Sequence, residues 1–149
     1  MGINPDLVGH IYPAGASYQV GREKIREFAT ATKASSPAHF DVQAAQALGY
    51  ADLVAPPTFV IIIAQRADAQ LISDPASGID FSRVVHADQR FTHHRPIVAG
   101  DQLVAELHVD TVRAMGGGAM ISTRAEIATV AGEKVATTVS SILVRGEDQ

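Results

Sequence analysis

One segment limits the possible folds of this chain more than any other: VAPPTFVIIIAQRADAQLIS, residues 54–73. Pro56 and Pro57 cannot lie inside a helix, but a proline can begin one, so the pair predicts a helix from Thr58 to about Leu71. For two turns its apolar side chains point in nearly all directions, and a helix that is apolar all round is a buried helix. The β-branched run within it also allows a buried strand, but the helix formers that follow favour a helix.

After residue 80 the apolar residues recur with a period of two, which is typical of strands with one buried face. Four such segments follow one another and are separated by turn residues: 83–94, 101–114, 118–130 and 133–145. They predict an antiparallel meander.

The first half of the chain is mostly helical. Residues 21–33 carry apolar side chains at helical spacing, and residues 41–50 read as a second short helix with Asp41 as its N-cap. Residues 17–21 allow a short strand. We therefore predict an α+β fold in a single domain, residues 1–149, in which the sheet wraps the buried helix.

Composition excludes several functions. The chain has 149 residues, a formal net charge of −4 and five phenylalanines, so it offers neither the basic surface nor the stacking aromatics of a nucleic-acid-binding protein. It has no cysteine, which excludes disulfides and thiolate nucleophiles. The N-terminus lacks the pattern of a signal peptide, and the longest apolar run is too short to cross a bilayer. These features predict a cytoplasmic protein with no membrane insertion.

Four segments carry a resemblance to a known family: 20–29, 41–60, 82–91 and 95–103. In this order they resemble the hotdog dehydratases and hydratases of the MaoC type. The closest resemblance is to the actinobacterial branch that includes the substrate-holding subunit of the (3R)-hydroxyacyl-ACP dehydratases of fatty-acid and mycolic-acid elongation. The resemblance implies a hotdog fold, a dimer, no cofactor and no metal.

The catalytic motif of active family members is Gly-Asp-any-Asn-Pro-any-His, on the loop that leaves the first helix. The corresponding segment here is KASSPAH, residues 33–39, so the histidine is His39 and the aspartate position holds Ala34. Dehydration breaks C–H and C–O bonds on adjacent carbons and uses two proton-transfer groups, of which alanine supplies none. His39 is therefore a candidate catalytic residue or a leftover of the motif. Asp41 is a possible replacement acid, although an N-cap carboxylate is already occupied by backbone N–H groups.

The resemblance also gives candidate substrate-binding residues. In related enzymes a backbone N–H at the start of the buried helix polarises the thioester carbonyl, which here points to Pro57, Thr58 and Phe59. Alternatively, these residues simply begin a core helix. Arg95 is a candidate for contact with the phosphates of coenzyme A or with an acidic carrier protein. The basic face formed by Arg22, Lys24 and Arg26 is another, or it is only a solvated helix face.

Polar residues in the strands are a weaker signal. His86, Asp88 and Arg90 are expected to share one strand face, and such pairs can bind metal. Alternating polar residues are more often the solvated face of a strand, and we expect no metal site.

Three functions remain open at this point. The first is a subunit of a (3R)-hydroxyacyl-thioester dehydratase that holds the acyl chain while a partner hotdog chain supplies the Asp–His pair. The second is a self-sufficient homodimeric enoyl-thioester hydratase that uses His39. The third is a non-catalytic acyl-thioester binding protein. In each case the ligand is an acyl thioester of acyl carrier protein or coenzyme A, and the assembly is a homodimer or a heterodimer.

Overall fold

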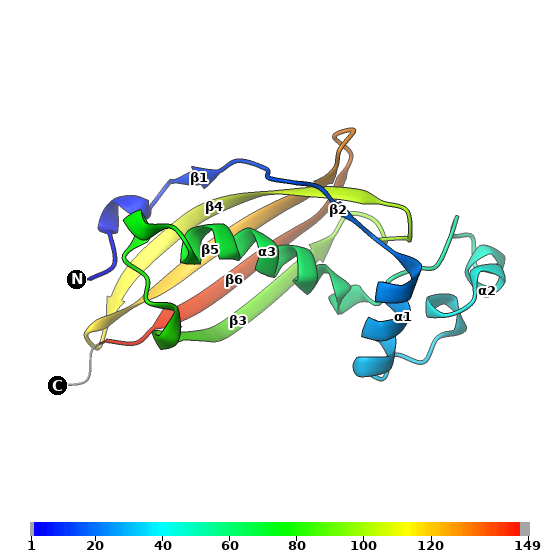
Figure 1. Ribbon diagram of the computed structural model, residues 1–149, viewed down its shortest axis with the longest axis horizontal. Helices are drawn as coiled ribbons and strands as arrows, with labels where there is room; N and C mark the ends of the chain where they lie inside the picture. The colour runs from blue at the N-terminus through cyan, green and yellow to red at the C-terminus, as the bar shows by residue number, and fades with distance from the viewer. Residues whose placement is uncertain (1, 147–149) are drawn as a thin grey trace.

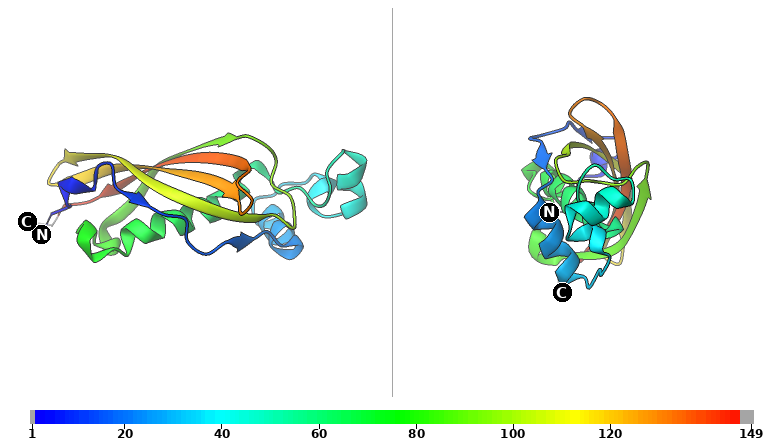
Figure 2. Two further views of the ribbon diagram at one scale, coloured as in Figure 1. Left: turned by 90° about the horizontal axis from the view of Figure 1, so that it is seen from above. Right: turned by 90° about the vertical axis from the view of Figure 1, so that its right-hand side faces the viewer.

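The computed structural model describes residues 2–146 and shows one curved antiparallel sheet wrapped around one long helix, α3 (Figures 1 and 2). The long strands are β3 (Val84–His93), β4 (Gln102–Met115), β5 (Gly118–Thr129) and β6 (Lys134–Val144). Two short strands, β1 (Ile11–Tyr12) and β2 (Tyr18–Gln19), both pair with β4. The order β1-β4-β5-β6-β3 leaves β3 at one edge of the sheet.

The segment after the proline pair is helical, as predicted. A 3₁₀ turn, Pro57–Val60, leads directly into α3 (Ile61–Ile72). The face of α3 that packs on the sheet includes Ile63, Ala67 and Leu71. Because this spacing follows one stripe of the helix, the other face stays uncovered within this chain. Gln65 and Ala69 are exposed there.

The hydrophobic core lies between α3 and the concave face of the sheet. The strand residues that reach it alternate with outward-facing ones, as the period-two pattern predicted, and the largest fully buried ones are Leu103, Leu107, Ile121 and Ile127. The alternation is broken in β4, where the register with β5 shifts between Val109 and Thr111. It is broken again in β3, between His86 and Asp88.

The two N-terminal helices, α1 (Arg22–Ala31) and α2 (Val42–Ala47), lie beyond one end of the sheet, beside the start of α3 (Figures 1 and 2). Asp41 caps α2, because its carboxylate accepts a hydrogen bond from the backbone N–H of Gln43 at 2.9 Å. Ala38 of the loop between the two helices, Ala45 of α2 and Val54 form a small buried cluster of their own.

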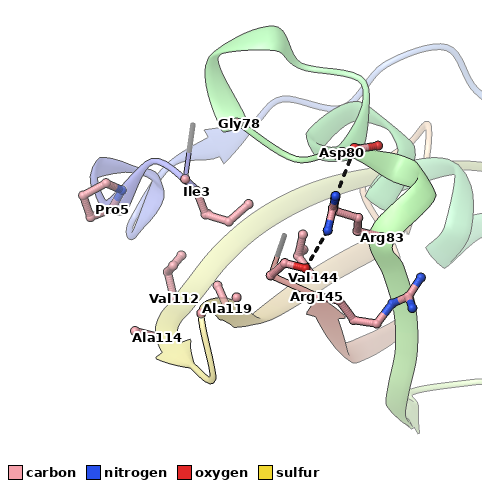
Figure 3. Close-up of a pocket in the computed structure, with 14 residues that line it drawn as sticks. Ile3, Pro5, Gly78, Asp80, Arg83, Val112, Ala114, Ala119, Val144 and Arg145 are labelled. Atoms are coloured by element: carbon pink, nitrogen blue, oxygen red, sulfur yellow. Dashed lines mark hydrogen bonds and ion pairs between the residues drawn. The ribbon is translucent and has the colours of Figure 1, made fainter. Parts of the chain in front are cut away.

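The opposite end of the sheet is closed by the N-terminal segment and the strand ends. Arg83 pairs with Asp80 and donates to the carbonyl of Gly146, next to a cavity of about 380 Å³ (Figure 3). The backbone N–H of Asn4 donates to the carbonyl of Ser77 at 3.0 Å. These contacts tie the start of the described chain to the segment that follows α3.

Candidate functional site

The loop between α1 and α2 has a backbone shape set by Lys33. Lys33 has φ of +60°, a left-handed conformation that glycine adopts readily and other residues adopt at a cost. The backbone N–H of Ala34 then donates to the carbonyl of Ala29 at 2.8 Å and closes the helix end. Lys33 stands at the position where the family motif has glycine, so the turn of the catalytic loop is present although the glycine is not.

His39 is the one ionisable side chain that this loop buries. It ends a 3₁₀ turn, Pro37–His39, and is 9% exposed. Its Nδ1 lies 2.7 Å from the carbonyl oxygen of Val54. Since a carbonyl only accepts, Nδ1 carries the hydrogen, and in the neutral ring Nε2 is then the acceptor. The ring is therefore held in the tautomer that can take up a proton at Nε2.

His39 lines a cavity of about 550 Å³ at the start of α3. Its walls come from the catalytic-motif loop, the segment after α2, the proline pair, and the residues that follow β3: Ser36, Ala38, His39, Leu48, Tyr50, Val54, Ala55, Pro56, Pro57, His93, His94, Arg95, Pro96 and Ile97. A volume of this size is ordinary for a small-molecule site. Among these lining residues there is no carboxylate.

The short side chain of Ala34, at the aspartate position of the motif, does not reach this cavity. Ala34 is half-buried and is not among the lining residues. Asp41 is not among them either, and its carboxylate is engaged in the cap of α2. The loop thus places one proton-transfer group, His39, at the cavity wall.

The three candidates at the start of the buried helix have different positions. Pro57 lines the cavity, while Thr58 is exposed and stands outside its wall. Phe59 is fully buried in the core, with its ring centroid 5.5 Å from that of Phe28 in an edge-to-face contact. The backbone N–H of Phe59 donates to the carbonyl of Pro56 at 2.9 Å. Because Pro56 and Pro57 have no N–H, Thr58 carries the first backbone N–H of this helix start, and the first N–H of a helix has no partner within it.

Arg95 lies at the rim of the cavity but is held by carboxylates. Its guanidinium makes two hydrogen bonds to Asp101, at 2.9 and 3.0 Å, and pairs with Glu133. Hydrogen bonding to Asp101 is the main cause that raises the pKa of Arg95. Arg95 therefore joins the loop after β3 to the β5–β6 turn and has little charge left for a ligand phosphate.

The basic residues of α1 are paired in the same way. Arg22 donates to both carboxylate oxygens of Asp52, at 3.0 and 2.8 Å, and this hydrogen bonding lowers the pKa of Asp52. Lys24 pairs with Glu27, and Arg26 pairs with Glu23. This helix face is consequently a row of neutralised pairs.

Asp68, a buried carboxyl on α3, was not among the predicted site residues. Asp68 is 8% exposed and accepts a hydrogen bond from the Thr123 hydroxyl at 2.7 Å. Burial is the largest cause that raises its pKa, against the opposing effect of its hydroxyl partners. A charged residue on the sheet-facing stripe of an otherwise apolar helix is the signal that was available in the sequence.

His86 and Asp88 do not share a strand face, contrary to the expectation from the sequence. The bulge between them turns the strand, so that His86 lines a cavity beside Asp68 while Asp88 pairs with Arg90 at the surface. Within residues 2–146, no group of three or more histidines and carboxylates is arranged to hold a metal ion. No helix in the same range is long and apolar enough to cross a membrane.

Comparison with known proteins places the chain in a family. The model of the FAS1-like dehydratase domain region matches residues 6–138. A UPF0336 protein of Leifsonia xyli is 51% identical over 98% of both chains, and one of Saccharopolyspora erythraea is 49% identical over 98% of this chain and 94% of its own.

Solved structures agree with this fold. A C-terminally truncated HadBC (3R-hydroxyacyl-ACP dehydratase) complex from Mycobacterium tuberculosis is 37% identical, with a TM-score of 0.84 over 93% of this chain and 97% of that one. A MaoC-like dehydratase is 34% identical, with a TM-score of 0.85 over 95% of this chain and 43% of that one. The R-hydratase PhaJ1 of Pseudomonas aeruginosa, at 18% identity and a TM-score of 0.73, shares the fold. The chain belongs to the FAS1-like dehydratase family and has the hotdog fold of the MaoC-like dehydratases.

Proposed function

We propose that this chain is the substrate-holding subunit of a (3R)-hydroxyacyl-thioester dehydratase of fatty-acid elongation, and that a partner hotdog chain supplies the Asp–His pair. The observation that carries the proposal is the motif loop. It keeps the left-handed turn at Lys33 and the buried His39, but it has Ala34 where the acid belongs. Relatives of known structure include the HadBC complex, which is a (3R)-hydroxyacyl-ACP dehydratase.

The chemistry shows what is missing. A base removes the α-proton, the C–H electron pair becomes the new double bond, and an acid protonates the β-hydroxyl as it leaves as water. His39, with Nε2 as acceptor, can serve one of these steps. Among the residues that line its cavity, none is a carboxylate that could serve the other. The isolated chain therefore lacks half of the pair.

Binding roles for the remaining candidates are part of the same proposal. Thr58 stands just outside the cavity wall, next to the wall residue Pro57, and its backbone N–H at the positive end of the helix is the donor we propose for the thioester carbonyl. Phe59 anchors this helix start in the core, and Arg95 fixes the rim through its two carboxylate partners.

The retained tautomer of His39 favours one alternative, a homodimeric enoyl-thioester hydratase that acts without a second subunit. Hydration of a crotonyl thioester separates the two. The purified chain is assayed alone, then after co-expression or titration with a hotdog chain that carries the intact Asp–His motif. The substrate-holding role predicts activity only with the partner, and activity that is insensitive to His39→Ala in this chain.

Robust turnover by the chain alone, lost in His39→Ala, would establish the homodimeric hydratase instead. Thioester binding with no turnover under any pairing would leave an acyl-thioester binding protein.

A further inference from the structure

A second cavity, of about 660 Å³, lies at the far end of α3 from His39. It is walled by the last turns of α3, by the segment before β3, and by β3 and β6: Gln65, Asp68, Ala69, Ile72, Ser73, Phe81, Val84, His86 and Ile142. Most of this wall is apolar. Asp68 and His86 are the ionisable groups in it.

Asp68 is tied to the sheet by side chains from more than one strand. Thr123 of β5 donates to Oδ1 at 2.7 Å, and the Ser140 hydroxyl, on β6, lies beside the same carboxyl, where it lowers the pKa of Asp68. The same Ser140 hydroxyl is 2.7 Å from Oε1 of Gln89 on β3, whose Nε2 is buried without a partner. A polar network thus crosses the apolar interface between helix and sheet.

This network has two proton arrangements. With the Gln89 amide as it stands, Ser140 donates to Gln89 and has no proton left for Asp68, so an Asp68–Ser140 bond needs the proton on Asp68. If the amide turns over, Nε2 donates to Ser140, and Ser140 is free to donate to a charged Asp68. In both arrangements the proton is used within the network, and a carboxyl lone pair stays free to accept a hydrogen bond from the cavity side.

The cavity is placed to continue a site on a second hotdog chain. It lies at the start of β3, while the His39 cavity lies at the end of the same strand. β3 is an edge strand, and Phe81 and Val85 near its start are 72% and 44% exposed. When an edge strand pairs antiparallel with the equivalent strand of a partner, the start of one lies opposite the end of the other. The Asp68 cavity then adjoins the partner's motif-loop cavity.

From this juxtaposition we propose that the Asp68 cavity receives the distal part of an acyl chain held at the partner's site, and that Asp68 selects chains that carry a hydroxyl group there. The inference rests on the proposed substrate-holding function. A plain methylene chain against Asp68 leaves the carboxyl without water and without a replacement hydrogen bond. A chain hydroxyl restores that bond by donating to the carboxyl in either arrangement of the network. Asp68 is thus a specificity-determining residue.

The test compares the binding of stearoyl-coenzyme A with a panel of hydroxystearoyl-coenzyme A isomers, whose hydroxyl is moved along the chain. Calorimetry is done on the purified chain and on its complex with a motif-bearing partner. We expect one hydroxyl position to bind at least about tenfold tighter than the unsubstituted chain, the worth of one buried hydrogen bond. Asp68→Leu should remove or invert this preference, while Asp68→Asn, which keeps donor and acceptor, should retain it.

Two further variants keep the test decisive if Asp68→Leu does not fold. Ala69→Leu adds volume on the cavity wall and leaves Asp68 in place, so it should weaken all long chains while crotonyl-coenzyme A still binds. Gln70→Leu, at a neighbouring α3 position that does not line this cavity, is the matched control and should change nothing.

The outcomes separate the two proposals. Absence of binding by every acyl thioester contradicts the substrate-holding function itself. Long chains that bind equally well with and without a hydroxyl at every position, or a preference that Asp68→Leu leaves intact, overturn the role of Asp68 alone. Long-chain binding that is insensitive to Ala69→Leu shows that the chain lies elsewhere.

Discussion

The two cavities at opposite ends of α3 hold their ionisable groups in opposite ways. His39 comes from a loop and is fixed by one backbone carbonyl, at 2.7 Å, with no carboxylate among the residues that line its cavity. Asp68 comes from the central helix and is fixed by hydroxyls of the sheet, which belong to the core. A group on a loop can lose its chemical partner without disturbing the fold, whereas a group in the helix–sheet interface is tied to stability. A substitution at the His39 end can therefore change activity without lowering the stability of the fold, whereas a substitution of Asp68 also changes stability.

The largest expected effect is on hydratase activity, from a substitution in the motif loop at the His39 end. Ala34→Asp restores the missing carboxyl on a loop whose backbone turn is already present. Because a positioned acid or base contributes about 10²–10⁴-fold, hydration of crotonyl-coenzyme A by the isolated chain should rise by a factor in that range. The matched control is Ala34→Asn, which has the same shape and no acid. An unchanged rate in Ala34→Asp would mean that the loop has lost more than one residue.

The next effect concerns the start of α3. Phe59→Ala removes a fully buried ring that packs edge-to-face on Phe28. Truncation of a buried phenylalanine typically lowers the free energy of unfolding by about 3–5 kcal/mol. Chemical denaturation measures the loss, and Phe81→Ala, at an exposed ring near the other end of α3, is the control. A loss below about 1 kcal/mol would contradict the anchoring role of Phe59.

A third experiment tests the charge at the Asp68 end. Burial raises the pKa of Asp68, so between the ordinary and the raised pKa the folded chain binds more protons than the unfolded chain, and stability falls as pH rises. Asp68→Asn carries no such charge. The variant should therefore become more stable than the wild type as the pH rises above about 3.9, and the difference should level off above the raised pKa of Asp68. At that plateau it should amount to about 1.4 kcal/mol for each pH unit by which folding raises this pKa.

Asp52→Asn should show the opposite dependence. Arg22 lowers the pKa of Asp52, so the wild type gains stability from this pair above about pH 3.9 and loses it as the pH falls through the lowered pKa. The variant should therefore be the less stable protein at neutral pH, and the two should converge in acid. Chemical denaturation from pH 3 to 8 measures the stability difference from the wild type for Asp68→Asn and Asp52→Asn. If this difference changed with pH in the same direction for both variants, the opposite pKa shifts of the two carboxyls would be refuted.

The smallest expected effect is at Lys33. A lysine with φ of +60° carries a backbone cost of roughly 1 kcal/mol that glycine avoids. Lys33→Gly should raise the free energy of unfolding by only part of that amount, because glycine also gives the unfolded chain more conformational entropy. Lys33→Ala removes the same charge without relieving the backbone, and its failure to stabilise would show that the gain is conformational.

Most of the fold was predictable because the local signals agree with the global structure. The proline pair, the helix formers after the apolar run and the four alternating segments each favour one arrangement, and the structure adopts it. β1 was missed because two residues are too few to show a period. The bulge at His86 was missed because His86, Asp88 and Arg90 stand at alternate positions, which in a regular strand would share one face.

The site was predictable only where a motif marks it. His39 and Ala34 were found through the spacing of the motif, and Pro57 and Arg95 through their place in the family segments. The partners that immobilise Arg95, which are Asp101 and Glu133, come from a distant turn and from a loop and leave no local pattern. Asp68 meets Thr123 across 55 positions of the chain, and only tertiary structure brings them together.

The pairing of Arg95 with Asp101 and Glu133 should weaken in two stages as ionic strength rises, and Arg95 lies at the rim of the His39 cavity. Glu133 is 59% exposed and Asp101 is 12% exposed, so added salt screens the first pair well before the second. At about 1 M salt, where the screening length falls to about 3 Å, the β5–β6 turn is released from Arg95 while the loop after β3 keeps its bidentate hold. Concentrated salt should thus loosen a support behind the entrance and leave the wall formed by the loop after β3 in place.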